Sequence, residues 1–284
     1  MREGDGDEHL TRLAGAVAEI ERLRSIGVPV DFVVHTGDLA DAADEPGADP
    51  APTRAGLAAL GELGVSWYAL GGNHDRRAHL VGADAPPGAI VSAVYPGGAG
   101  AHAAHADDLP ALLAAGVCRR VHGPLDCLFV NANPEDGERD LHGAIAPVQV
   151  GAVADHLDGL APGRRAAAFL HYPPLEQGTA WTGAPAGGET LHAALAVRAA
   201  RLAGVFAGHV HRGTCHARDG LLYVSVPALS RGFALWPGLG HAVDDLPTAG
   251  YHYVSIGPAG TRVQSHAFVA GRSRPSESIG APPT

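Results

Sequence analysis

The chain has 284 residues, of which 46% are hydrophobic and 18% charged, a balance typical of a globular domain. Its 20 basic residues are all arginine and are outnumbered by 30 acidic residues, so the formal net charge is −10. The absence of lysine excludes a lysine-containing phosphate loop and a Schiff-base lysine. The chain lacks the excess of basic residues that is typical of nucleic-acid-binding proteins, so we expect no nucleic-acid polymer as a partner.

Targeting signals and cysteines add further limits. No apolar run approaches the ~18 residues that a membrane span needs, and the first eight residues are acidic and polar, unlike a secretory signal. For the sequence as given, this predicts a cytoplasmic protein without a membrane partner. The cysteines, which form no C-x-x-C pair, predict buried thiols rather than a disulfide framework or a structural zinc site. They are Cys118, Cys127 and Cys215.

The first half of the chain alternates predicted helices and strands. Apolar residues three and four apart predict a helix over 8–25, with Asp7 as its N-cap and with Gly27 and Pro29 ending it. A weakly patterned segment, 82–116, is predicted to be a long loop with one helix near 108–115. The remaining predicted elements of this half are a strand over 30–36, a helix over 53–64 and a strand over 65–70.

The second half adds hairpins to this alternation. Turn residues between apolar runs predict three hairpins, which lie at 117–130, 213–226 and 251–268. Between them the pattern predicts helices over 148–160 and 189–202 and strands over 166–170 and 204–207. The whole pattern indicates one mixed α/β domain over residues 1–270, followed by a disordered tail over 271–284.

Four of the predicted strands end in polar clusters. The carboxyl ends of strands are where sites form in α/β folds, so we expect these clusters to converge. Their oxygen and nitrogen donors, without thiolate, suit Mn, Fe, Zn or Co. The clusters are Gly37-Asp38, Gly72-Asn73-His74-Asp75, His171 and Gly208-His209-Val210-His211.

These motifs, in this order, resemble those of the calcineurin-like metallophosphoesterases over about residues 30–230. The resemblance implies a two-sheet β-sandwich flanked by helices and a centre of two divalent metal ions. It implies that Asp38 bridges the ions, that Asn73, His171 and His209 complete one site, and that His211 serves the other. His74 would act on the phosphate or the leaving oxygen. The implied reaction is hydrolysis of a small phosphate ester by a metal-bridging hydroxide.

Further residues resemble the bacterial class III cyclic-nucleotide phosphodiesterase branch of that family. They are Arg77, Tyr172-Pro173-Pro174, Gly143 and Gln149. This resemblance favours phosphodiesters such as cyclic nucleotides, with Arg77 and Asn73 as substrate-binding residues, and it leaves monoesters open. Tyr172 stands where a second histidine is frequent, and we expect only a changed pocket wall from that difference.

The start of the chain departs from the family pattern. The family opens with a strand ending in Asp-x-His, which supplies two metal ligands, whereas here no apolar run precedes the helix at 8–25. The resemblance therefore places the missing first strand upstream of Met1. Asp7-Glu8-His9 matches the Asp-x-His motif in residue types, but we interpret it as the start of the helix. We expect one of the two metal sites to be weak in this chain and its activity to be impaired. The alternative function is a catalytically impaired phosphate-binding or regulatory member.

Overall fold

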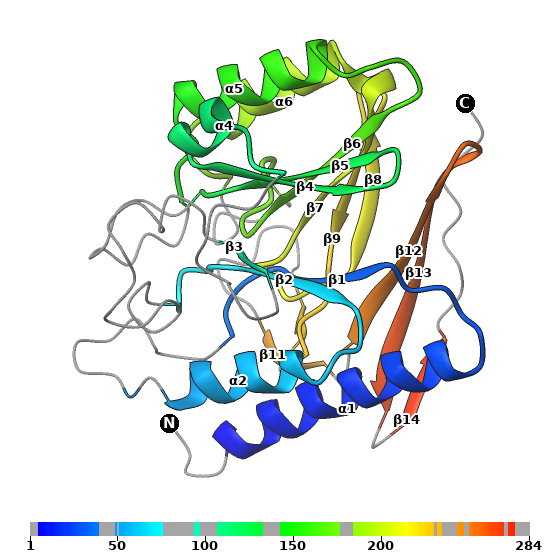
Figure 1. The fold of residues 1–284 in the computed structure, drawn as a ribbon. Coiled ribbons are helices and arrows are strands. Elements are labelled where there is room, and N and C mark those ends of the chain that lie inside the picture. The colour runs from blue at the N-terminus through cyan, green and yellow to red at the C-terminus, as the bar shows by residue number, and fades with distance from the viewer. Residues whose placement is uncertain are drawn as a thin grey trace.

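The computed structural model of the chain describes residues 5–39, 49, 51–75, 94–96, 107–132, 143–176, 184–229, 232–234, 243–246, 250–269 and 272–275. Figure 1 shows the described elements in layers. Two helices lie against a small sheet, a larger sheet follows, and further helices cover its far side. None of the described helices combines the length and the apolar character that a membrane crossing requires.

The first layers come from the N-terminal part of the chain. Strand β1 (Phe32–His35) pairs in parallel with β2 (Ser66–Leu70), and helices α1 (Asp5–Ser25) and α2 (Ala51–Gly61) pack on them through an apolar cluster. The predicted helices and strands of this part are confirmed. Within the described residues no strand precedes β1, and β1 pairs with β2 alone, so it is an edge strand.

Two local predictions in this part are wrong. Helix α1 begins at Asp5, so Asp7 lies inside the helix rather than at its N-cap. Strand β3 (Val94–Pro96) lies within the segment predicted to be a loop with one helix. It pairs antiparallel with Tyr68–Leu70 of β2. Such a pairing depends on a contact between distant segments, which a weak local pattern does not show.

The larger sheet has six strands in the order β4-β5-β6-β7-β9-β8. Strands β5, β6, β7 and β9 run parallel, and β4 and β8 join the edges as antiparallel partners. The two predicted hairpins, β4–β5 and β8–β9, are thereby confirmed. The strands are β4 (Val117–His122), β5 (Leu125–Val130), β6 (Arg165–Leu170), β7 (Leu202–Ala207), β8 (Thr214–Arg218) and β9 (Leu221–Ser225).

One face of this sheet is covered by α4 (Pro110–Ala114), α5 (Pro147–Asp158) and α6 (Gly188–Ala196) (Figure 1). The helix predicted over 189–202 ends at Ala196, because Val197 caps it and a separate 3-10 turn, Ala199–Arg201, leads into β7. The other face packs against β1, β2 and the C-terminal strands through an apolar cluster that includes stacked phenylalanine rings. Two sheets face each other with helices outside, as the predicted sandwich requires.

The C-terminal strands form a sheet of their own, β12 (Gly250–Gly257), β13 (Gly260–Val269) and β14 (Arg272–Pro275). The third predicted hairpin, β12–β13, is confirmed. The prediction of disorder from Gly271 is wrong for β14, because those polar residues gain backbone pairing along β13. Residues 276–284 lie outside the described residues. Two further short strands, β10 (Gly232–Ala234) and β11 (Val243–Leu246), pair with each other.

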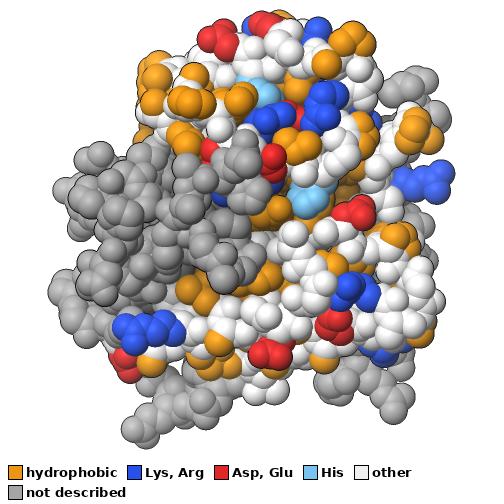
Figure 2. Space-filling view, viewed as in Figure 1, with side chains coloured by type: hydrophobic (Ala, Val, Ile, Leu, Met, Phe, Trp, Pro, Cys, Tyr) orange, Lys and Arg blue, Asp and Glu red, His pale blue; other side chains and the backbone are white. Residues whose placement is uncertain are grey.

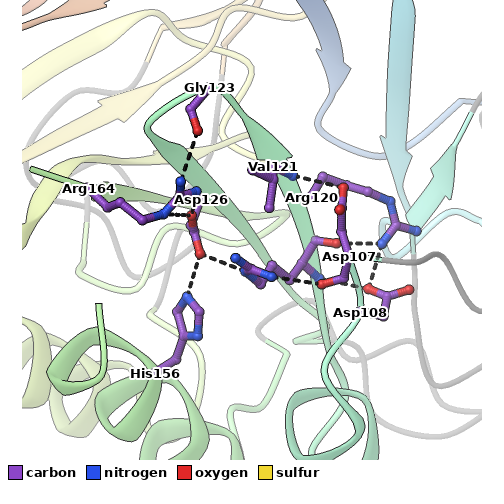
Figure 3. Close-up of polar contacts among 9 residues, drawn as sticks. Asp107, Asp108, Arg120, Val121, Gly123, Asp126, His156 and Arg164 are labelled. Atoms are coloured by element: carbon purple, nitrogen blue, oxygen red, sulfur yellow. Dashed lines mark hydrogen bonds and ion pairs between the residues drawn. The ribbon is translucent and has the colours of Figure 1, made fainter. Parts of the chain in front are cut away.

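A buried ionic cluster joins β4, β5, α5 and the turn before β6 (Figure 3). We name it the Asp126 cluster, and it comprises Asp126, Arg119, His156 and Arg164. Asp126 pairs with Ala166 at the start of β6, whereas the motif residue His171 follows the end of that strand. The Asp126 carboxylate is 1% exposed. It accepts hydrogen bonds from Arg119 Nε at 2.6 Å, His156 Nε2 at 2.9 Å and Arg164 Nε at 3.0 Å. Burial favours the neutral acid, but the two arginines outweigh it and lower the pKa of Asp126.

Candidate metal centre

The predicted site residues follow four strands of two different sheets. Asp38 follows β1, Asn73 and His74 follow β2, His171 follows β6, and His209 and His211 follow β7. Strands β1 and β2 are parallel in one sheet, and β6 and β7 are parallel in the other. Stacking of the two sheets therefore brings the carboxyl ends of both pairs together.

Four of these side chains meet. Asp38, His171 and His209 each offer a ligand atom, and the three atoms lie within 4.8 Å of one another. Asn73 Oδ1 lies 3.1 Å from His171 Nε2 and 3.0 Å from His209 Nδ1. Asp38 Oδ2 lies 3.3 Å from His171 Nε2. Residues separated by up to 171 positions in the chain, from 38 to 209, thus share one small volume.

The hydrogen bonding of His171 decides how a cation fits here. The carbonyl of Thr36 lies 2.7 Å from His171 Nδ1 and can only accept, so Nδ1 carries a proton and donates it. In the neutral ring Nε2 is then an acceptor, yet it faces the oxygens of Asp38 and Asn73. Either a proton on Nε2, which the charge of Asp38 favours, or a divalent cation can satisfy these converging oxygens. The donor set therefore fits a divalent metal ion.

The electrostatics of the buried carboxylates agree with that fit. Burial raises the pKa of Asp38, but the neighbouring His171 outweighs this and holds the pKa of Asp38 below its ordinary value. Burial lowers the pKa of His171, and the charge of Asp38 raises it above its ordinary value. Burial and the negative charge of Asp38 together raise the pKa of Asp75 to about 6. Negative charge is therefore crowded in this volume, where positive charge stabilises it.

Asp75 is a residue of the site to which the sequence analysis gave no role. Its Oδ2 accepts the backbone N–H of Gly72 at 2.9 Å and of Asp38 at 2.7 Å, and its Oδ1 accepts that of Leu39 at 3.0 Å. It therefore ties the loop after β1 to the loop after β2. In the sequence, only its position two residues after Asn73 indicated that Asp75 could belong to the site.

The backbone of the site is held in unusual conformations. Of the four described non-glycine residues with positive φ, three belong here, namely Asp38 (58°), His209 (65°) and His211 (51°). Such conformations are costly for side chains with a Cβ, and they concentrate at functional sites. Gly72 is required for close approach, because a Cβ there would collide with the Asp38 carboxylate.

His74 and His211 lie at the edge of this group. The backbone N–H of His74 donates to Asp38 Oδ1 at 2.9 Å, which anchors His74 beside the ligands. His211 follows His209 on the same loop, and its Nδ1, like that of His74, is buried. The catalytic role of His74 and the ligand role of His211 stay predictions. Arg77 lies outside the described residues, so its substrate-binding role also stays a prediction.

The expectation for Tyr172 as a changed pocket wall is wrong. Tyr172 is 1% exposed and belongs to the core between the six-stranded sheet and its helices. Its ring packs against the imidazoles of His171 and His209. The sequence showed only that Tyr172 follows a candidate ligand, and the direction of its side chain depends on the packing of distant segments.

Several solved structures share this fold at low sequence identity. A dimetal phosphatase from Danio rerio aligns with a TM-score of 0.64 and 14% identity, covering 91% of this chain and 86% of that one. Purple acid phosphatase PPD1 from yellow lupin (Lupinus luteus) seeds aligns with a TM-score of 0.56 and 14% identity, covering 94% of this chain and 48% of that one. GAP50, the anchor in the inner membrane complex of Plasmodium, aligns with a TM-score of 0.54 and 10% identity, covering 98% of this chain and 86% of that one.

The family assignment comes from the sequence. No curated protein matches the chain. A family model described as calcineurin-like phosphoesterase matches residues 6–213, which include every residue of the predicted metal centre. The chain therefore belongs to the calcineurin-like phosphoesterase family.

Proposed function

We propose that this protein is a metal-dependent hydrolase of phosphate esters. The observation that carries the proposal is the buried group of Asp38, Asn73, His171 and His209, in which ligand atoms face one another at the ends of parallel strands. Membership of the calcineurin-like phosphoesterase family supports the same reaction class. The similar folds of two phosphatases agree with it.

The chain's own residues divide into ligands and supports. Asp38, Asn73, His171 and His209 would hold one divalent ion, and Asp38 together with His211 would hold a second. Bound Mn, Fe, Zn or Co would neutralise phosphate charge and lower the pKa of water to give a nucleophile. Thr36 fixes the proton of His171 on Nδ1, which leaves Nε2 as the ligand atom.

His74 is the proposed catalytic residue. The backbone N–H of His74 is fixed to Asp38 by a 2.9 Å hydrogen bond, which places the residue beside the proposed ions. Its side chain is not one of the proposed ligands. There it would donate a proton to the leaving oxygen or a hydrogen bond to the phosphate. Residues that resemble the class III phosphodiesterase branch favour a diester such as a cyclic nucleotide, with Arg77 and Asn73 binding its phosphate.

We expect a small substrate rather than a nucleic-acid polymer. On the face shown in Figure 2, the described arginines lie among acidic and apolar side chains and form no continuous basic stripe. The net charge of −10 acts in the same direction, since it repels polyanions.

A catalytically impaired, phosphate-binding member is the second candidate. The fold also occurs in GAP50, which is named as an anchor and not as an enzyme. The two candidates differ in one measurable respect, because an impaired member would bind Mn²⁺ and phosphate without turning over an ester.

The test combines metal binding with turnover. Mn²⁺ and Co²⁺ binding is measured by calorimetry, and hydrolysis of bis(p-nitrophenyl) phosphate, p-nitrophenyl phosphate and cyclic AMP is assayed with each metal. We expect metal-dependent hydrolysis that Asp38→Asn abolishes. The surface variant Asp158→Asn, whose side chain is 57% exposed beside Arg198, should leave both measurements unchanged. Metal binding without any hydrolysis would favour the impaired candidate, and absence of metal binding would overturn both.

A further inference from the structure

We propose that Tyr172 is a positioning residue, which holds the imidazoles of His171 and His209 in the orientation that a metal ion needs. This inference rests on the proposed function, since it concerns the ligands of the same metal centre. It assigns a role to a buried ring that the sequence indicated only as part of a pocket wall.

The first observation is a triangle of three rings. The Tyr172 ring lies 4.9 Å from the His171 ring and 4.7 Å from the His209 ring, measured between centroids. The two imidazoles lie 5.1 Å from each other. Tyr172 meets His171 edge to face, at an interplanar angle of 81°, and meets His209 at 55°. These are distances and angles at which aromatic rings attract and restrict one another.

The second observation concerns which side of the imidazoles is supported. The ligand nitrogens of His171 and His209 are directed at Asn73 Oδ1, at 3.1 and 3.0 Å. Tyr172 is 1% exposed and is part of the apolar core, so its contact with the imidazoles comes from within the protein. The core thereby limits how far either imidazole can rotate away from the metal position.

The third observation is the space that Gly143 leaves for the Tyr172 ring. Gly143 has a φ of 65°, and a Cβ added there would lie 2.6 Å from both Cδ2 and Cε2 of Tyr172. A real Cβ would force the ring, or the backbone beside it, to move. The same Cβ would lie 2.6 Å from the carbonyl oxygen of Ala132, so the experiment must separate these two contacts.

Metal affinity responds to such support because a ligand ring that can rotate must be ordered when the ion binds. Groups that orient metal-binding histidines typically contribute a factor of ~10–100 to affinity. Tyr172→Leu removes the aromatic contacts with both imidazoles and should weaken Mn²⁺ binding about tenfold. Tyr172→Phe keeps the ring and should stay within about threefold of the unsubstituted protein.

Gly143→Ala tests the same idea without changing Tyr172. Gly163→Ala is the matched control, because Gly163 also has a positive φ (82°) but a Cβ there would meet nothing within 4 Å. Both changes introduce backbone strain, whereas only Gly143→Ala displaces the ring. We expect about tenfold weaker Mn²⁺ binding for Gly143→Ala and unchanged binding for Gly163→Ala.

A double-mutant cycle separates Tyr172 from Ala132. If Gly143→Ala acts through the ring, adding it to Tyr172→Leu should weaken Mn²⁺ binding little further. If it acts through the Ala132 carbonyl, the two losses should multiply. The readouts are the Mn²⁺ dissociation constant from calorimetry, the visible absorption of bound Co²⁺, which reports ligand geometry, and the thermal midpoint of the metal-free protein.

The outcomes are distinct. Weaker Mn²⁺ binding and a changed Co²⁺ spectrum for Tyr172→Leu and Gly143→Ala, with Tyr172→Phe and Gly163→Ala unchanged, support the inference. Unchanged binding and spectra in the first two variants overturn it, as do losses that multiply in the cycle or an equal loss for Tyr172→Phe. If Tyr172→Leu does not fold, the comparison of Gly143→Ala with Gly163→Ala decides. Failure of the unsubstituted protein to bind Mn²⁺ or Co²⁺ would contradict the proposed function instead.

Discussion

The Asp126 cluster and the metal centre are both buried groups of carboxylate and histidine side chains, but their hydrogen bonding differs. Around Asp126, two arginines and a histidine donate to the two carboxylate oxygens, so donors and acceptors match. Around Asp38, oxygens of an acid and an amide converge on Nε2 of His171 without any of the described arginines among them. A matched cluster can serve stability by itself, whereas carboxylate, amide and imidazole ligand atoms that converge in a small volume fit a cation.

The backbones of the two regions differ in the same way. Arg119 and Asp126 lie on the regular, paired strands β4 and β5. Asp38 and His209 lie just after strands, in left-handed conformations that cost free energy. We therefore expect the Asp126 cluster to stabilise the folded protein. We expect the metal centre to lower the stability of the metal-free protein, because its backbone is held in costly conformations. Substitutions in each region test that difference.

The largest effect should follow substitution of Asp38. Asp38→Asn removes the charged ligand that is proposed to bridge the ions, so turnover of a phosphate ester should fall about 10⁴-fold. A metal centre supplies several kcal/mol of transition-state stabilisation, and each 1.36 kcal/mol is a factor of ten. The rise in thermal midpoint that Mn²⁺ gives to the unsubstituted protein should also disappear. A variant that keeps that rise would show that Asp38 is not a ligand.

Asp126→Ala should have the opposite profile. It leaves two partly buried arginines without their carboxylate, and breaking a buried ion pair in this way costs about 3–5 kcal/mol of unfolding free energy. Denaturant unfolding measures that loss. At a temperature where the variant stays folded, its Mn²⁺ affinity should equal that of the unsubstituted protein. A matching loss of Mn²⁺ affinity would contradict the separation of the two regions.

His74→Ala should affect turnover more than metal binding. General acid catalysis typically contributes ~10²–10⁴-fold, so we expect turnover to fall at least ~10²-fold. Mn²⁺ content, measured by elemental analysis after gel filtration, should stay unchanged, because the His74 hydrogen bond to Asp38 is donated by the backbone N–H, which the substitution keeps. Parallel loss of Mn²⁺ and turnover would make His74 a ligand.

The smallest effect concerns pH and His156. Burial lowers the pKa of His156, although Asp126 opposes this, so the folded protein binds a proton there less readily than the unfolded chain does. Stability should therefore decrease as the pH falls below ~6.5, the ordinary histidine value, towards the lower folded pKa. His156→Gln should flatten the decline in unfolding free energy between pH 7.5 and 5.5. Contributions from the metal-centre histidines cancel when the two proteins are compared without metal, and equal slopes would refute the prediction.

Much of the fold could be predicted because its signals are local. The three hairpins and the main helices follow from apolar spacing and turn residues, which act within a few positions. Strands β3 and β14 could not be predicted in this way. Each is short and weakly patterned, and each forms because a distant strand offers backbone partners. The end of α6 at Ala196 differed for a similar reason, since the next residues form a separate turn before β7.

The metal centre shows the same division. The sequence alone determined which residue types follow the strands, and this predicted the convergence of Asp38, Asn73, His171, His209 and His211. The first four meet in the structure, and the ligand role of His211 stays a prediction. Only the tertiary structure decided that Asp75 joins two loops and that Tyr172 supports two imidazoles. The physical reason is that motif spacing fixes only the position of a residue relative to the end of its strand. Its direction and partners are set by packing between segments that meet only in the folded protein.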